Sequence, residues 1–251
     1  MLLAIDSGNT NIVFAVFSDD GKVVRTWRLD THSNVDFGLW MLDQGLVASD
    51  ITAAIIATVV PRNLEPLIEL CEVTLGVEPL VVGHDDVDLG VEVLLDTPSE
   101  IGADRLVNAV AAGERYGGSL ICVDFGTATT FDILDKNKNY AGGVIAPGIN
   151  LSLEALHAHA AKLPRVEPKR PERVIGTSTI SAMQSGIYWG YVSLIEGMVK
   201  RIKIEFGSPM TVIATGGLSP LFSPAIDAIE TIDTDLTLRG LFLIYQRNRS
   251  T

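Results

Sequence analysis

The chain has 251 residues, of which 47% are hydrophobic and 20% are charged. This length suits one large domain or two of about 125 residues each, and the composition excludes a disordered chain or a small disulfide scaffold. The 31 acidic residues outnumber the 19 basic ones, which leaves a formal charge of -12. Such a charge repels phosphate backbones and anionic membrane surfaces, so we expect neither nucleic acid nor membrane as a partner.

The cysteines and the N-terminal segment indicate a cellular compartment. Cys71 and Cys122 lie in apolar runs, which is typical of buried thiols under reducing conditions. The N-terminal segment reaches Asp6 after a short apolar stretch with no basic region before it, unlike a signal peptide or a membrane span. We therefore expect a cytoplasmic protein.

Strand and helix patterns alternate through the first hundred residues. Three β-rich segments, at 2–5, 12–17 and 23–29, are split by turn-forming residues and predict an antiparallel meander. Helical periodicity follows at 36–44 and 64–75, and short buried strands are predicted at 53–60 and 79–82. This alternation predicts an α/β fold.

Beyond residue 100 the expected elements are a helix at 105–117, a Gly- and Pro-rich loop at 142–148, helices at 151–163 and 178–203, a strand entering a glycine turn at 211–217, and a helix at 236–247. Asn150 is expected to cap the second of these helices and Pro164 to stop it. Residues 164–173 are rich in proline and locally basic, which favours an exposed linker or, alternatively, an anion-binding loop.

The sequence resembles itself at an offset of 118 positions. IDSGNTNIVFAVF near the start matches VDFGTATTFDIL, so that Asp6 aligns with Asp124 and Gly8 with Gly126. Each copy reads as a buried strand, an Asp-x-Gly turn and a second strand. The repeat predicts two similar α/β halves, residues 1–115 and 116–251, that face each other across a cleft.

Three turns combine the groups that a phosphate chain requires. Asp6 to Thr10, Asp124 to Thr129 and Thr215 to Gly217 bring together glycine, hydroxyl or amide groups and, in the first two, a carboxylate. Glycine allows backbone N–H groups to approach a phosphate, and a carboxylate can hold the metal that neutralises it. The alternative is that these turns only close hairpins. Common nucleotide-binding and zinc motifs are absent from the sequence.

Gly102-Ala103-Asp104-Arg105 begins the helical pattern at 105–117. An Asp at a helix start is often only a cap. Beside an arginine at a cleft, the same carboxylate could accept a proton from a substrate hydroxyl while the guanidinium binds an anionic substrate. The residues by themselves leave both interpretations open.

Taken together, the motifs resemble the type III pantothenate kinases, a branch of the actin-like, sugar-kinase and chaperone ATPase superfamily. The resemblance covers essentially the whole chain, and six motifs follow the family's order: DSGNT, GADR, DFGTATTFD, GGVIAPG, GTST and TGG. It implies a homodimer of chains with two ribonuclease-H-like halves. It also implies ATP-dependent phosphorylation of pantothenate to 4'-phosphopantothenate, the first step of coenzyme A biosynthesis.

The resemblance also implies a role for individual residues. ATP with Mg2+ would be bound by Thr127 and by the residues of the first turn, which are Asp6, Ser7, Gly8, Asn9, Thr10, Asn11, Ile12 and Val13. Asp6 would also hold the magnesium. Asp124 would bind a monovalent cation, K+ or NH4+. Asp104 would be the general base that deprotonates pantothenate. Pantothenate would be bound, in a pocket at the dimer interface, by Gly102, Ala103, Asp104, Arg105 and Thr179.

One position departs from the family pattern, because Leu95 stands where many members have a tyrosine that contacts the substrate. Two alternative functions remain open from the sequence. The first is an accessory transcription factor without catalysis, a role also described in this family. The second is a kinase or phosphatase of the same superfamily acting on a sugar, acetate or polyphosphate. Gly186 and Gly190, four residues apart on the long helix, are expected to pack against a second subunit.

Overall fold

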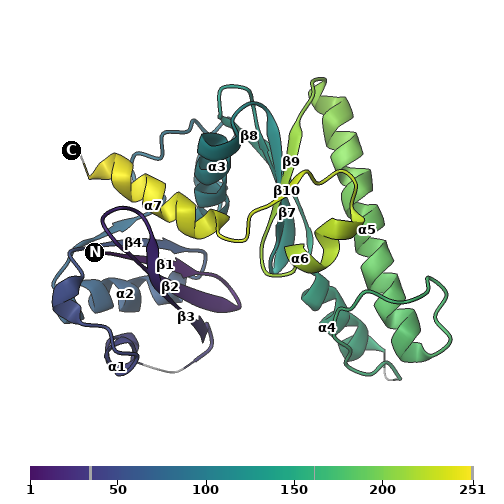
Figure 1. Cartoon of the computed structure of the whole chain (residues 1–251), viewed down its shortest axis with the longest axis horizontal. Helices are drawn as coiled ribbons and strands as arrows, with labels where there is room; N and C mark the ends of the chain where they lie inside the picture. The colour runs from purple at the N-terminus through teal and green to yellow at the C-terminus, as the bar shows by residue number, and fades with distance from the viewer. Residues whose placement is uncertain (34–35, 161, 250–251) are drawn as a thin grey trace. The chain divides into compact units, whose positions relative to one another are not determined.

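A computed structural model describes residues 1–33, 36–160 and 162–249. The chain folds as two compact units (Figure 1). Unit 1 contains the segments 1–111 and 236–251, and unit 2 contains residues 112–235. The division at residue 111 lies close to the expected one. The C-terminal helix, which the sequence repeat assigned to the second half, packs in unit 1.

Unit 1 is built on a five-stranded sheet in the order β3-β2-β1-β4-β5. Its strands are β1 (Leu2–Ser7), β2 (Asn11–Phe17), β3 (Val23–Asp30), β4 (Ala53–Thr58) and β5 (Pro79–Val81). The first three form the expected antiparallel meander, and β4 pairs parallel to both β1 and β5. The register sets Asp6 opposite Val13 on one side and Ala57 on the other.

Helices cover both faces of this sheet. They are α1 (Phe37–Asp43), α2 (Pro61–Glu69) with the π-helical turn η2 (Leu70–Thr74), α3 (Ala103–Tyr116) and α7 (Leu236–Asn248), with 3-10 turns η1 (Ala48–Asp50) and η3 (Pro98–Glu100). Successive strand residues point to opposite faces, so Leu3 packs with Met41 of α1, whereas Leu2 packs with Leu241 of α7. The buried β1 is therefore apolar at every position before Asp6.

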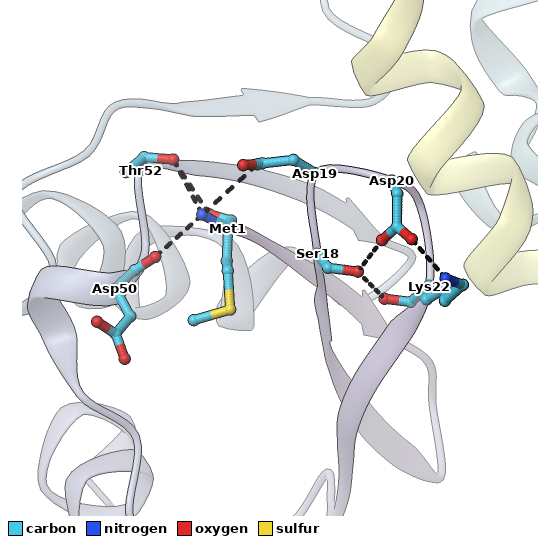
Figure 2. A network of polar contacts seen from close by, with 7 residues as sticks. All are labelled: Met1, Ser18, Asp19, Asp20, Lys22, Asp50 and Thr52. Carbon is cyan, nitrogen blue, oxygen red and sulfur yellow. Dashed lines mark hydrogen bonds and ion pairs between the residues drawn. The ribbon is translucent and has the colours of Figure 1, made fainter.

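The end of the unit 1 sheet opposite the Asp6 turn is held by polar contacts (Figure 2). The Met1 ammonium donates to the Asp50 carbonyl at 3.0 Å and to the Thr52 hydroxyl at 3.2 Å. In the turn between β2 and β3, Asp20 accepts hydrogen bonds from Ser18 and Lys22, each at 2.6 Å. These contacts fix the start of β1 and leave its far end to the candidate site.

Unit 2 repeats the architecture with the strand order β10-β9-β6-β7-β8. Its elements are β6 (Leu120–Phe125), β7 (Ala128–Leu134), β8 (Tyr140–Pro147), α4 (Ile149–His159), α5 (Thr179–Phe206), β9 (Thr211–Thr215), α6 (Ser219–Phe222), η4 (Ser223–Ala225) and β10 (Thr231–Ile232). One sheet face packs against α4 and α5, where Val123 meets Leu153 and Tyr188. Figure 1 shows the length of α5 beside this sheet.

The internal repeat predicted from the sequence is confirmed. β1 and β6 share one pattern of buried and partly buried residues, and β2 and β7 share another. Each first strand pairs antiparallel with the second and parallel with the fourth strand of its own sheet. The expected fold class, two similar α/β halves, is therefore confirmed.

Two predictions in unit 2 are wrong. Residues 142–148, predicted as a loop, lie largely in the edge strand β8, because pairing with β7 overrides the local preference of glycine and proline. Helix α4 begins at Ile149 with Gly148 as its N-cap, so Asn150 lies inside the helix, and it ends at His159, before Pro164. Residue 161, which fell in the predicted helix, lies outside the described residues.

The remaining predicted elements are present within a few residues. Residues 164–173 form an irregular, mostly exposed segment, and this segment lies inside unit 2 rather than between the units. Among the helices of the described ranges, none has the length and apolar character needed to cross a bilayer.

Candidate active site

The turn between β1 and β2 presents the predicted phosphate-binding residues. Asp6 is partly buried near the end of β1, while Asn9 and Thr10 are exposed at the tip. The Gly8 N–H donates to the Asn11 carbonyl at 3.0 Å and closes the turn. The tip thus combines backbone, amide and hydroxyl groups beside a carboxylate, as the sequence predicts.

Two of the predicted ATP-contacting residues turn their side chains into the core of unit 1. The Ser7 hydroxyl is fully buried and accepts a hydrogen bond from Nδ2 of Asn63 at 3.0 Å. The Ile12 side chain is fully buried in the cluster that contains Phe14. Neither side chain is therefore available to a ligand.

Asp104 lies in the first turn of α3. The Gly102 carbonyl accepts from the N–H of Leu106 at 3.2 Å, so Gly102 occupies the N-cap position and Asp104 lies two residues inside. Oδ1 of Asp104 accepts from the N–H of Arg105 at 2.8 Å. Asp104 is therefore not the N-cap residue, which weakens the interpretation of this carboxylate as a cap.

Glycine at position 102 makes room for this carboxylate. A Cβ added to Gly102 would lie 2.7 Å from Oδ1 of Asp104 and 3.2 Å from Cγ1 of Val59. Ala103, the next residue, is buried in the core. The carboxylate is thus held in a space that a larger residue at position 102 would close.

Asp6 and Asp104 both have raised pKa values. The pKa of Asp6 is raised to about 7, mainly by burial and then by the charge of Asp104, while Arg28 opposes the shift. Burial also raises the pKa of Asp104, against the lowering effect of Arg105. Raised pKa values in a neighbouring pair of carboxylates are characteristic of functional sites, because burying two like charges together opposes folding.

Unit 2 holds the second predicted turn. Asp124 is partly buried near the end of β6, Thr127 is exposed at the tip, and the Gly126 N–H donates to the Ala128 carbonyl at 3.1 Å. Gly216, with φ +88°, brings the end of β9 against Asp124, and an added Cβ would overlap the Asp124 carboxylate. The predicted TGG turn therefore packs directly on the predicted cation ligand.

Acidic groups lie near Cys122, on the strand that leads to this turn. Burial, followed by the charges of Asp132, Asp124 and Asp233, raises the pKa of the Cys122 thiol well above its usual value. Asp132 is fully buried and accepts a hydrogen bond from the Tyr140 hydroxyl at 2.7 Å. Cys122 is thus unsuited to act as a nucleophile.

Thr179 is the first residue of α5 and is exposed. Ser178 caps this helix through a reciprocal hydrogen-bonding arrangement with Ser181. Thr179, Asp124 and Thr127 belong to unit 2, whereas Asp6 and the Gly102–Arg105 segment belong to unit 1. Within unit 1, Asp6 and Asp104 are far apart in sequence but close enough for the charge of Asp104 to raise the pKa of Asp6.

A shallow groove of about 500 Å3 follows α5. Small residues on its floor include Ala182, Gly186, Gly190 and Ser193, with Val174 and Trp189 also lining it. Beside it, three apolar side chains are strongly exposed: Val174 at 65%, Ile175 at 82% and Ile180 at 50%. A Cβ at Gly186 or Gly190 would meet open space, so neither glycine is needed for packing within the chain.

Three polar residues that support the first turn are not predicted by the sequence motifs. Thr31, Thr58 and Asn63 donate hydrogen bonds to Gly8 or Ser7 from three separate segments of unit 1. The signal that could have found them is a polar residue at or just beyond the end of a strand or helix next to β1. Within the described part of the chain, no group of three or more His, Cys, Asp or Glu residues forms a metal site.

The comparisons with known proteins agree on a family. A family model described as type III pantothenate kinase matches residues 2–201. A type III pantothenate kinase of Rhodospirillum rubrum is 60% identical over 99% of this chain and 99% of its own length. That of Caulobacter vibrioides is 52% identical over 99% of this chain and 98% of its own.

Solved structures share the fold at low sequence identity. A Campylobacter jejuni protein described as a Baf family transcriptional activator has a TM-score of 0.62 and 19% identity, covering 99% of this chain and all of its own. A Sinorhizobium meliloti protein described as a 2-dehydro-3-deoxygalactonokinase has a TM-score of 0.61 and 13% identity, covering 98% and 99%. At these identities the likeness concerns the fold alone.

Proposed function

The chain belongs to the type III pantothenate kinase family and phosphorylates pantothenate in coenzyme A biosynthesis, and we propose that Asp104 is its general base. In this proposal Asp104 accepts the proton of the primary hydroxyl of pantothenate as that oxygen attacks the γ-phosphate of ATP. The products are 4'-phosphopantothenate and ADP. Neither of the alternative functions is favoured, because relatives over the full chain are named as pantothenate kinases.

The observation that carries this proposal is the pair of neighbouring carboxylates, Asp6 and Asp104, in unit 1. Phosphoryl transfer requires positioning, charge neutralisation and a base, but no covalent nucleophile. Two acids with different surroundings can divide these tasks. Asp104, at a helix start and beside Arg105, serves as the base, and Asp6, next to the turn, serves the phosphates.

We assign the ATP phosphates to the β1–β2 turn, residues 6–13, whose exposed tip at Asn9 and Thr10 offers amide and hydroxyl groups. Magnesium usually binds proteins through one or two carboxylates together with substrate phosphates, so Asp6 fits it without a larger protein cage. The raised pKa of Asp6 supports this fit, because a cation would relieve the cost of the buried charge. When bound, Mg2+ would neutralise charge on the phosphates.

In unit 2 we assign Thr127 to ATP contact and Asp124 to a monovalent cation, K+ or NH4+. The carboxylate of Asp124 supports a cation there, and the close approach of Gly216 supports a tightly bounded position. The cation would offset charge near the phosphates. Its identity is left to a comparison of activity in K+, NH4+ and Na+ salts.

Pantothenate is assigned to Gly102, Ala103, Asp104, Arg105 and Thr179. The guanidinium of Arg105 can form paired hydrogen bonds with the pantothenate carboxylate. Leu95 stands where many members have a tyrosine, so this position supplies no aromatic contact to the substrate. A cytoplasmic location is part of the same proposal.

The test is an assay of pantothenate phosphorylation with ATP and Mg2+, with and without K+. Phosphopantothenate should form, and Asp104→Asn should lower kcat about a thousandfold while retaining ATP binding. Asp6→Asn should instead weaken Mg2+-dependent ATP binding. Purified protein that binds ATP yet leaves pantothenate unphosphorylated would overturn the proposal.

We further propose that the enzyme is a homodimer joined through the α5 groove. The floor of small residues and the exposed Val174, Ile175 and Ile180 support close apolar contact with a second copy. Sedimentation at micromolar concentration should give a dimer for the wild type and a monomer for Gly186→Arg. Glu205→Arg, an exposed position on α5 outside the groove, is the control and should remain dimeric. A wild-type monomer would contradict the proposal.

A further inference from the structure

The β1–β2 turn directs its backbone carbonyl oxygens toward protein donors. The Ser7 carbonyl accepts from the Val59 N–H at 3.1 Å and from the Thr58 hydroxyl at 3.3 Å. Farther along the turn, the Asn11 carbonyl accepts from the Gly8 N–H at 3.0 Å. These oxygens are thereby committed to contacts inside unit 1.

Thr31 binds two of the three carbonyls between them, those of Gly8 and Thr10. Its hydroxyl donates to the Gly8 carbonyl at 2.7 Å, and its N–H donates to the Thr10 carbonyl at 3.0 Å. Thr31 follows directly after β3 and is only 5% exposed. A single residue from the neighbouring strand end therefore binds the turn at two points.

Binding of a polyphosphate makes the orientation of these carbonyls important. Phosphate oxygens are bound by N–H and O–H donors, whereas a carbonyl oxygen that faced them would repel them. A peptide unit places its C=O and its N–H on opposite sides, so fixing the carbonyl of one residue toward the protein turns the N–H of the next residue outward. Hydrogen bonds to the Gly8 and Thr10 carbonyls thus orient the N–H groups of Asn9 and Asn11.

We propose that Thr31 is a positioning residue for ATP: its hydroxyl holds the Gly8–Asn9 peptide so that the turn presents donors to the phosphates. This inference rests on the proposed function of the turn. Thr31 is not assigned a contact with ATP itself, and its effect acts through Gly8. The buried position of the hydroxyl in a 2.7 Å bond supports a fixed orientation.

The experiment compares Thr31→Val, which removes the hydroxyl but keeps the shape, with Thr31→Ser, which keeps the hydroxyl. Loss of one net hydrogen bond corresponds to about a tenfold change in binding. Thr31→Val should raise the KM for ATP and the Kd for ATP–Mg2+, measured by calorimetry, by about that factor, with the KM for pantothenate unchanged. Thr31→Ser should restore ATP binding close to the wild-type value.

Thr26→Val is the matched control, because Thr26 is an exposed residue on the same strand. It should leave both KM values unchanged. If Thr31→Val does not fold, Thr31→Ala serves as the second variant without the hydroxyl. Equal ATP affinity in the hydroxyl-free variant and the wild type, or equal damage in Thr31→Ser, would overturn the role of Thr31. Wild-type protein that binds ATP but leaves pantothenate unphosphorylated would instead overturn the proposed function, and the ATP isotherms would still decide the role of Thr31.

Discussion

The turns that carry Asp6 and Asp124 have the same framework but different supports. Both follow the first strand of a sheet with the same order and the same burial pattern, and both are closed by a hydrogen bond from a glycine N–H. The ladder ends at Ser7 and Ile12 in unit 1 but at Phe125 and Thr129 in unit 2. The turn of unit 1 is therefore one residue longer than that of unit 2.

The residues around each turn differ at equivalent positions. After the third strand, unit 1 has Thr31, whose hydroxyl bonds the turn, whereas unit 2 has Gly148, where an added Cβ would overlap the Thr127 carbonyl. Beside the first strand, unit 1 has the Thr58 hydroxyl and unit 2 has Gly216. Polar side chains hold the first turn, and close backbone packing made possible by glycine holds the second.

This difference matches the tasks that we assign to the two units. A longer turn held by side-chain hydrogen bonds offers several oriented donors for phosphates. A shorter turn packed tightly by glycines brings carboxylate and backbone oxygens together, which suits a cation. The same folding pattern can thus support anion binding in one copy and cation binding in the other.

The largest expected effect is a loss of kcat, and it should differ between a variant in unit 1 and a variant in unit 2. Asp104→Asn keeps the shape of the side chain but removes the proposed base, so kcat should fall about a thousandfold. Asp124→Asn should cause a smaller loss, one that depends on the concentration of K+. Steady-state assays with calorimetric ATP binding measure both effects. Equal losses of kcat in the two variants, independent of K+, would show that the division of tasks is wrong.

A second prediction concerns the space around the base. Gly102→Ala places a methyl group 2.7 Å from the expected position of Oδ1 of Asp104, so the carboxylate must move. Displacement of a catalytic group by about 1 Å can cost about a hundredfold in rate, and we expect kcat to fall by that factor while ATP affinity is retained. The control is Ser208→Ala, because Ser208 is exposed and lies outside the three candidate turns. Unchanged kcat in Gly102→Ala would argue against Asp104 as the base.

The sequence predicts the two hairpins of this comparison, because each hairpin is a local, contiguous structure. Strand, Asp-x-Gly turn and strand are contiguous, so their alternating apolar pattern and turn residues reveal both hairpins. The offset is 118 positions between β1 and β6 but 117 between β2 and β7, because the turn of unit 2 is one residue shorter. The similar residues in the two turns hide this difference in length from a sequence comparison. The register of the second strands could be read only from the pairing.

The hydrogen bonds that support the first turn cannot be predicted from local sequence patterns, because they join segments that are distant in sequence. Thr31 bonds Gly8 across 23 positions, and Asn63 bonds Ser7 across 56. Neither residue stands in a motif, and a lone threonine or asparagine is common near turns. Strand β8 was mistaken for a loop for the same reason: its glycines and Pro147 favour irregular structure locally, while pairing with β7 decides the outcome.

The glycine-supported turn gives a third prediction, on stability. Gly148→Ala introduces a Cβ that overlaps the Thr127 carbonyl at an ordinary φ of -74°, so the penalty is steric. Such overpacking costs about 1–3 kcal/mol, and the midpoint of urea unfolding should fall accordingly. Gly217→Ala should change stability by less than about 0.5 kcal/mol. If Gly148→Ala is as stable as the wild type, close packing does not support the second turn.

The smallest expected effect distinguishes the turns by their charge, and it follows from the raised pKa of Asp6. The pKa of the Asp6 carboxyl rises from 3.8 in the unfolded chain to about 7 in the folded chain. Its contribution to stability is therefore fully present below about pH 4, where the carboxyl is protonated, and is lost as the pH rises through 7. In the absence of nucleotide and divalent metal, Asp6→Asn should therefore gain stability relative to the wild type between pH 5 and pH 8. Because Asp6 is partly exposed, we expect a relative gain of about 1 kcal/mol, or about 2–4 °C in Tm.

Asp20→Asn is the control for this last measurement. Hydrogen bonds from Lys22 and Ser18 lower the pKa of Asp20 to about 2, so its carboxyl stays ionised across the same range. The difference in unfolding free energy between Asp20→Asn and the wild type should stay constant between pH 5 and pH 8. Any stability linked to the Asp20 carboxyl is lost only as the pH falls toward 2. If the curve of Asp6→Asn also runs parallel to the wild type, the folded protein does not raise the pKa of Asp6. The first turn would then lack the uncompensated buried charge that supports magnesium binding there.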